Sequence, residues 1–278
     1  ELSVCPILLN ISSPLDGTYN DDKIATNLST NILVDEITYI VLSDERPKER
    51  RLCKECDEYG YSKVKKLDFD DGQHNITFKA KKNGNFSSKT KHIFVDSKEP
   101  KIKKTFPKRK DYTNGSFIVE YDEDNPKHIN LHYSDKLKVK NDCPFDPDER
   151  HKDCEFNINL SDFDGQSLEY WFEIEDIAGN KDESRVTEIN VDLTPPNITK
   201  LNYSIDGRRI EFDIEVSEEV SLDYFDQNDR IPGWKSFCRN CDSYNRRKSF
   251  SKGNHTLIIK AEDKARNIDT ESISFEIY

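Results

Sequence analysis

The feature that most constrains this chain is an internal repeat with a period of about 90 residues. Three segments end in the same way, with an alternating apolar strand, a short turn that closes on Asn, and a second alternating strand. The turn asparagines are Asn85, Asn180 and Asn267, so successive repeats lie 95 and 87 residues apart. We therefore expect three copies of one structural unit, at residues 1–99, 100–196 and 197–278.

Each repeat contains the pattern of a β-strand with one buried face. In the third unit Leu257, Ile259 and Ala261 alternate with residues that point to the opposite side. Further strands are expected at residues 32–42, 115–121, 128–133, 154–160, 198–204, 209–216 and 220–224. No long segment has helical periodicity, so the sequence predicts an all-β chain of three tandem antiparallel immunoglobulin-like sandwiches. Trp171 is expected in the core of the second sandwich.

Prolines mark the two places where one unit joins the next. Glu99-Pro100 precedes the second unit, and Pro195-Pro196 precedes the third. Proline fixes its own φ and restricts the residue before it to extended conformations. We therefore expect short, stiff connections and units that lie end to end.

The composition excludes several classes of function. The 278 residues carry a formal net charge of −12, and an acidic chain is a poor binder of nucleic acid or anionic membranes. Glycine-rich phosphate loops, HExxH and GxSxG are absent, so we expect no enzyme activity and no cofactor. No apolar run reaches the ~18 residues of a membrane helix. Because Met is absent and the sequence opens on Glu1, we expect a processed segment whose targeting signal, if any, lies upstream.

Six of the seven cysteines fall as one close pair in each unit: Cys53 and Cys56, Cys143 and Cys154, and Cys238 and Cys241. A β-turn brings residues i and i+3 within ~7 Å, which suits the Cα separation of a disulfide. We expect three local disulfides, each stabilising by ~2 kcal/mol for a CxxC ring and ~3 kcal/mol for the longer ring. Disulfides at this density indicate an oxidising, extracellular compartment.

Other roles for the cysteines stay open at this point. Zinc would need four thiolates in one place, but the two CxxC pairs belong to different units. A thioredoxin-like role would need a CxxC at the start of a helix, and neither pair has helical flanks. Cys5 is left over: it pairs with a partner outside this sequence, pairs with another molecule, or stays free and buried.

The glycosylation motif Asn-X-Ser/Thr occurs nine times, against about three expected by chance. This excess indicates an exported glycoprotein with glycans on all three units. The alternative is that Asn, Ser and Thr meet often because all three favour turns. The nine positions are Asn10, Asn27, Asn75, Asn85, Asn114, Asn159, Asn197, Asn202 and Asn254.

Clustered carboxylates in the middle unit make calcium an alternative to the expected absence of metal. Residues 100–196 carry 14 basic and 22 acidic side chains, a net charge of −8. Loop carboxylates can supply the six to eight oxygens that Ca²⁺ takes, but no EF-hand spacing is present. We prefer the interpretation of a solvated rim that keeps the molecule soluble. The loop carboxylates are Asp122, Glu123, Asp124, Asp146, Asp148, Glu149 and Asp153.

Several motifs resemble modules that are repeated in prokaryotic, especially archaeal, cell-surface proteins. They are the opening Ile11-Ser-Ser-Pro-Leu-Asp-Gly-Thr-Tyr-Asn20, the CxxC pairs followed by Gly72-x-His74 and Gly253-Asn-His255, Asp176-x-Ala-Gly-Asn180, and the linker Val191-Asp-Leu-Thr-Pro-Pro196. The first and third units depart from the Asp-x-Ala-Gly-Asn pattern. The resemblance implies immunoglobulin-like domains of the fibronectin-III or bacterial type, in stalks, adhesins or surface-layer subunits.

Three functions follow as hypotheses. The first is a non-enzymatic extracellular structural protein, a stalk or a surface-layer or adhesin segment, whose partners are its own copies, other surface proteins or glycans. The second is an adhesion module that recognises a glycan or a host surface protein, with Trp234 and Tyr59 near the CxxC pairs as the expected contacts. The third is an accessory part of a larger exported enzyme.

Overall fold

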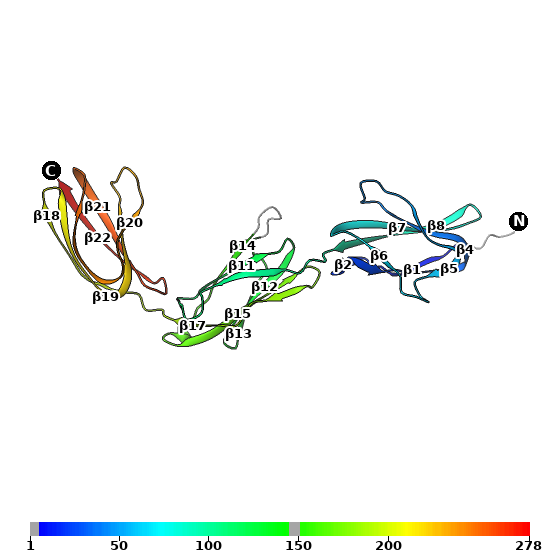
Figure 1. Cartoon of the computed structure of the whole chain (residues 1–278), viewed down its shortest axis with the longest axis horizontal. Helices are drawn as coiled ribbons and strands as arrows, with labels where there is room; N and C mark the ends of the chain where they lie inside the picture. The colour runs from blue at the N-terminus through cyan, green and yellow to red at the C-terminus, as the bar shows by residue number, and fades with distance from the viewer. Residues whose placement is uncertain (1–5, 145–150) are drawn as a thin grey trace.

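The structure is a computed structural model that describes residues 6–144 and 151–278. Three β-sheet lobes follow one another along one long axis, and the two termini lie at opposite ends (Figure 1). The described residues form no α-helix, only one 3₁₀ turn at Ser161–Phe163, so none of them belongs to a helix that could cross a membrane.

The first lobe contains a six-stranded sheet and a two-stranded sheet. The large sheet has the order β1-β4-β7-β8-β2, with β5 beside β4, and β3 pairs with β6. β4 pairs with β1 through its first residues and with β7 through its last, so one strand serves both layers. The bounds are β1 (Leu9–Ser13), β2 (Gly17–Tyr19), β3 (Lys23–Ala25), β4 (Asn27–Val41), β5 (Arg50–Tyr59), β6 (Lys66–Asp68), β7 (Gly72–Lys82) and β8 (Asn85–Val95).

The second lobe has two separate sheets that face each other. One has the order β10-β17-β15-β12-β13, with β16 beside β15, and the other has the order β14-β11-β9. The bounds are β9 (Lys101–Phe106), β10 (Tyr112–Thr113), β11 (Ser116–Asp122), β12 (Pro126–Tyr133), β13 (Lys136–Lys140), β14 (Lys152–Asn157), β15 (Ser167–Asp176), β16 (Lys181–Glu183) and β17 (Thr187–Val191).

The third lobe is one sheet of order β18-β19-β21-β22, with β20 beside β19. The sequence predicts two strands at residues 209–216 and 220–224, but the structure has one long strand whose register shifts between Glu215 and Val220. The shift bends β19, which pairs with β18 before it and with β21 after it. The bounds are β18 (Ile198–Asp206), β19 (Arg209–Asp226), β20 (Trp234–Ser249), β21 (Gly253–Glu262) and β22 (Ile268–Ile277).

Each lobe encloses its own apolar core, and the chain is an all-β protein of three tandem antiparallel immunoglobulin-like sandwiches. The predicted alternation in the third unit is confirmed, because Leu257, Ile259 and Ala261 are fully buried. The prediction for Trp171 is wrong. Its neighbours Tyr170 and Phe172 face the core, so strand alternation turns Trp171 outward, where its ring stacks on His132 at 4.6 Å.

Candidate functional site at the domain junctions

Asn180 of the second lobe holds the linker that leads from the first lobe. Its side-chain Nδ2 donates to the carbonyl oxygens of Asp96 at 2.9 Å and of Lys98 at 3.4 Å. Asp176 orients this amide: Oδ2 accepts the same Nδ2 at 2.8 Å, and Oδ1 accepts the backbone amides of Ala178 and Asn180. Because both linker carbonyls bond to one oriented side chain, the path of the linker over the second lobe is fixed. We call this arrangement the first asparagine clamp.

The same arrangement recurs between the second and third lobes. Asn267 Nδ2 donates to the carbonyl oxygens of Asp192 at 2.8 Å and of Thr194 at 3.5 Å. Asp263 accepts that Nδ2 on Oδ2 and the Asn267 amide on Oδ1, both at 2.8 Å. This is the second asparagine clamp, and it places Asn267 in the role that Asn180 has at the first junction.

A second aspartate in each turn fixes the strand that follows the linker. Asp182 accepts the backbone amide of Ile102 at 2.7 Å, and Asp269 accepts that of Ile198 at 2.8 Å. Both aspartates lie two residues after the clamp asparagine. The two junctions therefore share three side chains with the spacing Asp-x3-Asn-x-Asp.

Beside the first clamp lies the first carboxylate cluster, which consists of Asp96, Glu123 and Asp176. Asp96 follows β8, Glu123 lies between β11 and β12, and Asp176 ends β15. Each offers an oxygen within 4.8 Å of the other two, and their exposed fractions are 5%, 7% and 0%. Burial raises the pKa of Glu123 to about 7, and the charges of Asp96 and Asp176 add to the rise. Burial also raises the pKa of Asp96.

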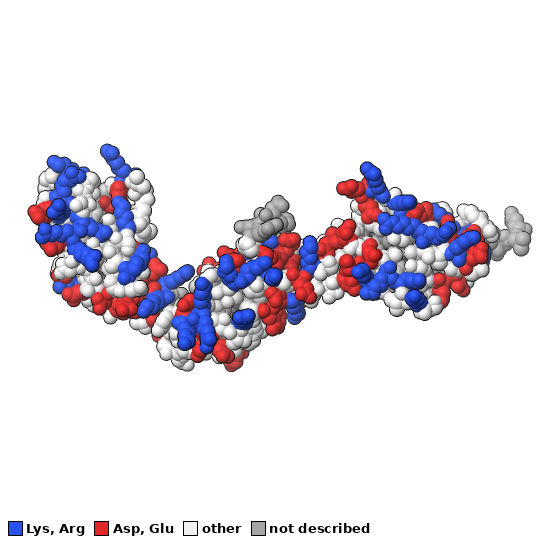
Figure 2. All heavy atoms as spheres, viewed as in Figure 1, with Lys and Arg blue, Asp and Glu red and all other residues white. Residues whose placement is uncertain are grey.

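This cluster opens into a cleft of about 480 Å³ between the first two lobes, lined by residues of both. Acidic side chains gather around this junction in Figure 2. Lys98 at the cleft bonds to Asp71 at 3.2 Å, and the lysines near the loop pair with Asp122 and Asp124 rather than with Glu123. No described lysine, arginine or histidine forms an ion pair with a member of the first carboxylate cluster.

The second carboxylate cluster consists of Asp192, Glu218 and Asp263, and it stands beside the second clamp. Its three carboxylates also offer oxygens within 4.8 Å of one another. Asp263 is buried, while Asp192 and Glu218 are half-buried. Burial raises the pKa of Glu218, and the negative charges of Asp263 and Asp192 act in the same direction. Lys264 opposes this rise, although its own ion pair is with Glu219 at 3.1 Å.

The sequence contains the junction residues, but it does not show that they come together in the fold. The turn asparagines were expected only as turn formers, and Asp122, Glu123 and Asp124 as one solvated rim. The structure separates the last three, because only Glu123 belongs to a cluster. The repeated Asp-x3-Asn-x-Asp spacing was the available signal for the clamps. Glu218 has no such signal, since it lies inside β19 where the strand shifts register.

All three expected cysteine pairs are disulfides in the structure, so these sulfurs present no thiolates for zinc. Each CxxC disulfide lies within a strand rather than in a loop, one in β5 and one in β20, and both strands border a long bent strand. The third residues, Glu55 and Asn240, have φ of 50° and 49°. In β20 the register shifts between Cys241 and Cys238, so that disulfide closes a bulge in an edge strand, whereas the register of β5 is unchanged from Cys56 to Cys53. Cys5 lies outside the described residues.

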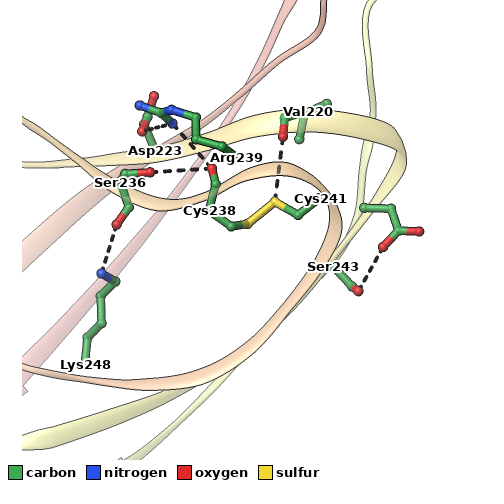
Figure 3. Close-up of a disulfide and its surroundings, with 9 residues drawn as sticks. Val220, Asp223, Ser236, Cys238, Arg239, Cys241, Ser243 and Lys248 are labelled. Carbon is green, nitrogen blue, oxygen red and sulfur yellow. Dashed lines mark hydrogen bonds and ion pairs between the residues drawn. A yellow bond between two sulfur atoms is a disulfide. The ribbon is translucent and has the colours of Figure 1, made fainter.

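Figure 3 shows the disulfide of the third lobe and the strand contacts around it. Arg239, inside the CxxC ring, pairs with Asp223 of β19 at 2.6 Å. Lys248 of β20 donates to the Ser236 carbonyl oxygen at 2.9 Å. The Arg239–Asp223 ion pair therefore holds β20 against β19, whereas the Lys248 hydrogen bond joins two parts of β20 itself.

The two aromatic residues expected as binding contacts have different surroundings. Trp234 begins β20 and is 51% exposed, with the Phe225 ring at 5.7 Å and Lys260 Nζ 5.0 Å from its ring centre. Tyr59 ends β5, is half-buried against the first core, and has a pKa raised by burial. An exposed contact is therefore consistent with the position of Trp234 and not with that of Tyr59.

The nine glycosylation motifs differ in accessibility. Asn27, Asn75 and Asn114 are half-buried, and Asn75 Oδ1 lies 2.6 Å from His92 Nδ1. The other six asparagines are exposed: Asn10, Asn85, Asn159, Asn197, Asn202 and Asn254. If glycans are attached, we expect them first at these six.

Within residues 6–144 and 151–278, one further group of ligand-type side chains lies close together, His128 with Glu173 and Glu175. Asp146, Asp148 and Glu149 lie outside the described residues, and Asp153 is exposed on β14. His128 lies near Glu173 and Glu175, but Lys127 and Lys181 already pair with these glutamates.

No protein-family model and no curated protein matches this chain. Among solved structures it is similar to an I-band fragment of titin, with 14% identity, a TM-score of 0.40, and coverage of 99% of this chain and 100% of that one. It is similar to Sidekick-1 immunoglobulin domains 1–5, with 10% identity, a TM-score of 0.38, and coverage of 99% and 60%.

The chain is also similar to dimeric latent PorU from Porphyromonas gingivalis, with 9% identity and a TM-score of 0.32. The match covers 98% of this chain but only 34% of PorU, so the chain spans about a third of that protein's length. Similarities at this level assign no function. The fold is established by the sheets and cores of the chain itself.

Proposed function

We propose that this chain is an extracellular structural protein without catalytic activity, a stalk or a surface-layer or adhesin segment of a prokaryotic, archaeal-type cell surface. The observation that carries the proposal is the asparagine clamp, which recurs at both junctions with the same donor, acceptors and spacing. Its partners are other copies of the chain, other surface proteins or surface glycans.

The clamps give a physical reason for a stiff rod. Free linkers let domains reorient, and relative motion is the default unless contacts prevent it. Here each linker contains at least one proline, two of its carbonyls bond to a side chain of the next lobe, and an aspartate fixes the next strand. A chain that holds three lobes in a fixed arrangement is suited to act as a spacer or as a stalk that projects other domains.

The exposed surface is consistent with an extracellular protein. Three disulfides and the exposed glycosylation motifs suit an oxidising compartment. The disulfide-closed bulge in β20 disturbs the backbone pairing groups of an edge strand, which discourages uncontrolled strand addition. Association with partners would then depend on specific surfaces.

Non-reducing peptide mass spectrometry of protein from its native source tests this proposal. We expect three intact disulfide-linked peptides and glycans on several of the six exposed asparagines. Free thiols together with unmodified asparagines would contradict the extracellular assignment and return the cysteines to a redox role.

The exposed Trp234 supports a second candidate, an adhesion module that recognises a glycan or host surface protein. Trp234→Ala should reduce binding to the partner cells at least tenfold without lowering the melting temperature. Phe86→Ala is the matched control, because Phe86 is 62% exposed and also has a lysine, Lys79, above its ring. Equal binding by both variants, or a loss of stability in Trp234→Ala, would contradict this role.

A further inference from the structure

The outer edge of the last strand is covered in the first two lobes and open in the third. In the first lobe β2 pairs in parallel with the end of β8, and in the second lobe β10 pairs in the same way with the end of β17. Within residues 6–144 and 151–278, β22 of the third lobe pairs with β21 alone. The third lobe therefore lacks a strand that both other lobes have.

The open edge follows from the connection between the first strands of the lobe. In the first two lobes the chain continues after Pro14 or Pro107 to form β2 or β10 beside the last strand. In the third lobe only Gly207 and Arg208 separate β18 from β19. This short turn returns the chain directly to the same sheet, so no residues of the connection are left to reach β22.

Backbone amides at this edge have acceptors in the first two lobes. The amide of Asp96, which directly follows β8, donates to the Tyr19 carbonyl oxygen at 2.9 Å. The amide of Asp192, which directly follows β17, donates to the Thr113 carbonyl oxygen at 3.0 Å. Tyr278 directly follows β22, and no backbone carbonyl of the described residues accepts its amide. β22 therefore offers the same hydrogen-bonding edge without its covering strand.

Side chains of β18 and β22 form an apolar surface beside this edge. The Tyr203 ring packs on Phe275 at 5.8 Å, and the Tyr203 hydroxyl donates to the Ser274 carbonyl oxygen at 2.9 Å. Because backbone groups alternate in direction along a strand, Ser274 and Glu276 both direct theirs to the open edge. Tyr203 is 38% exposed, and Ile205, on the same face of β18, is 48% exposed. An added strand would pair with the backbone and also cover these apolar side chains.

β22 has none of the features that commonly protect an edge strand from pairing. Its ten residues contain no lysine, arginine or proline, and its register with β21 is regular from one end to the other. In β20, another outer strand of this lobe, the register shifts at the disulfide. The contrast indicates that the edge of β22 is kept available for pairing.

We propose that β22 receives a strand from a partner protein, which pairs with it in parallel as β2 and β10 pair with the last strands of the other lobes. The added strand places a β-branched or aromatic side chain opposite Ile277, because Tyr19 and Thr113 lie at this position in the other lobes. Beside Glu276 it carries a basic or neutral residue, since an acidic one would be repelled.

Charge makes a second copy of the chain a poorer occupant than a different protein. Two β22 strands side by side would bring Asp269, Glu271 and Glu276 of both copies together. β22 contains no basic residue to compensate these charges. Like charges across a strand pair destabilise it.

This inference rests on the proposed function and deepens it, because it names the kind of partner that the chain would hold. The two can still fail separately. A chain that takes no added strand would keep its disulfides and clamps. Free thiols would contradict the extracellular role and leave strand binding intact.

Hydrogen-exchange mass spectrometry of the full 278-residue chain tests the proposal with a synthetic peptide as the probe. The peptide has the sequence of Lys108–Asn114, the basic segment that forms β10 in the second lobe. At ~1 mM peptide, exchange within residues 268–278 should slow about twofold, which corresponds to half occupancy at a dissociation constant of ~1 mM. The same peptide with Thr113→Pro should not slow exchange, because proline lacks the amide needed for pairing.

Variants of two glutamates in β22 locate the binding. Glu276→Pro removes an amide that faces the open edge, so the fold should remain and the protection should be lost. Glu276→Lys should weaken binding of the basic peptide by about twofold. Glu271→Lys is the matched control, because the same charge change lies ~16 Å away along the strand, beyond the Debye length of ~8 Å. If Glu276→Pro does not fold, the comparison of Glu276→Lys with Glu271→Lys provides the test.

Three results would overturn the proposal. The first is that the peptide gives residues 268–278 no protection. The second is equal protection in the wild type and in folded Glu276→Pro. The third is protection of residues 268–278 that rises with protein concentration in the absence of peptide, because the occupant would then be a second copy.

Discussion

At the first junction all three carboxylates are more than nine-tenths buried, whereas at the second only Asp263 is. The clamps show the opposite order, since Asn267 is 8% exposed and Asn180 is half-buried. Lys264 also brings a positive charge near the second cluster, while the lysines of the first junction are engaged elsewhere. Equivalent positions of the repeat therefore differ in burial. The first junction buries its carboxylates more deeply, and the second buries its clamp asparagine more deeply.

This difference explains why only one cluster carries a strongly altered acid. Glu123 loses contact with water and faces two carboxylates, so its pKa rises to about 7. Glu218 has the same two kinds of neighbour, but it keeps part of its hydration and has Lys264 nearby. The repeat therefore fixes which residues meet, and the surrounding loops decide how much their charges interact.

The largest expected effect is on the pH dependence of stability without metal. Glu123 binds a proton more tightly in the folded protein than in the unfolded chain, so the free energy of unfolding should rise as pH falls from 8 to 5. The rise should reach up to about 3 kcal/mol, at 1.36 kcal/mol for each unit of pKa shift. Urea unfolding in chelator at several pH values measures it.

Two variants sharpen that prediction. Glu123→Gln should remove most of the pH dependence between pH 5 and 8, and Glu218→Gln should remove less. Stability that stays level or rises with pH in the metal-free wild type would show that the first cluster is not a group of uncompensated charges.

The next effect compares the clamps. Asn267→Ala should lower the free energy of unfolding by ~2 kcal/mol and Asn180→Ala by ~1 kcal/mol, because a buried carbonyl loses more when its donor is removed. Asn245→Ala, an exposed asparagine of β20, should change it by less than ~0.5 kcal/mol. A larger loss for Asn180→Ala would reverse the proposed order of the two clamps.

Much of the fold could be predicted because its signals are local. Strand alternation, prolines at the joins and closely spaced cysteines all depend on neighbours in sequence. The error at Trp171 came from weighing residue type above alternation: Tyr170 and Phe172 on either side face the core, which forces Trp171 outward. The alternation of side chains along the strand, applied to Trp171, would have given the observed outward orientation.

The junction sites could not be predicted because they depend on contacts between distant segments. Asp96, Glu123 and Asp176 belong to a linker, a loop and a strand end, and only the folded junction brings their oxygens together. Glu218 lies at the register shift in β19, and no pattern of residues in the sequence predicted that shift. Only the spacing that includes Asn180 and Asn267 was visible beforehand, and its partners are backbone carbonyls of the preceding linker.

Small-angle X-ray scattering of the full chain most directly tests whether the clamps hold the lobes in place. The wild type and Asn245→Ala should give the same extended, narrow distribution of distances. Asn180→Ala combined with Asn267→Ala should give a broader distribution with a shorter mean, because both linkers become free to bend. Scattering from this double variant that superimposes on the wild type would show that the asparagine clamps do not determine the arrangement of the lobes.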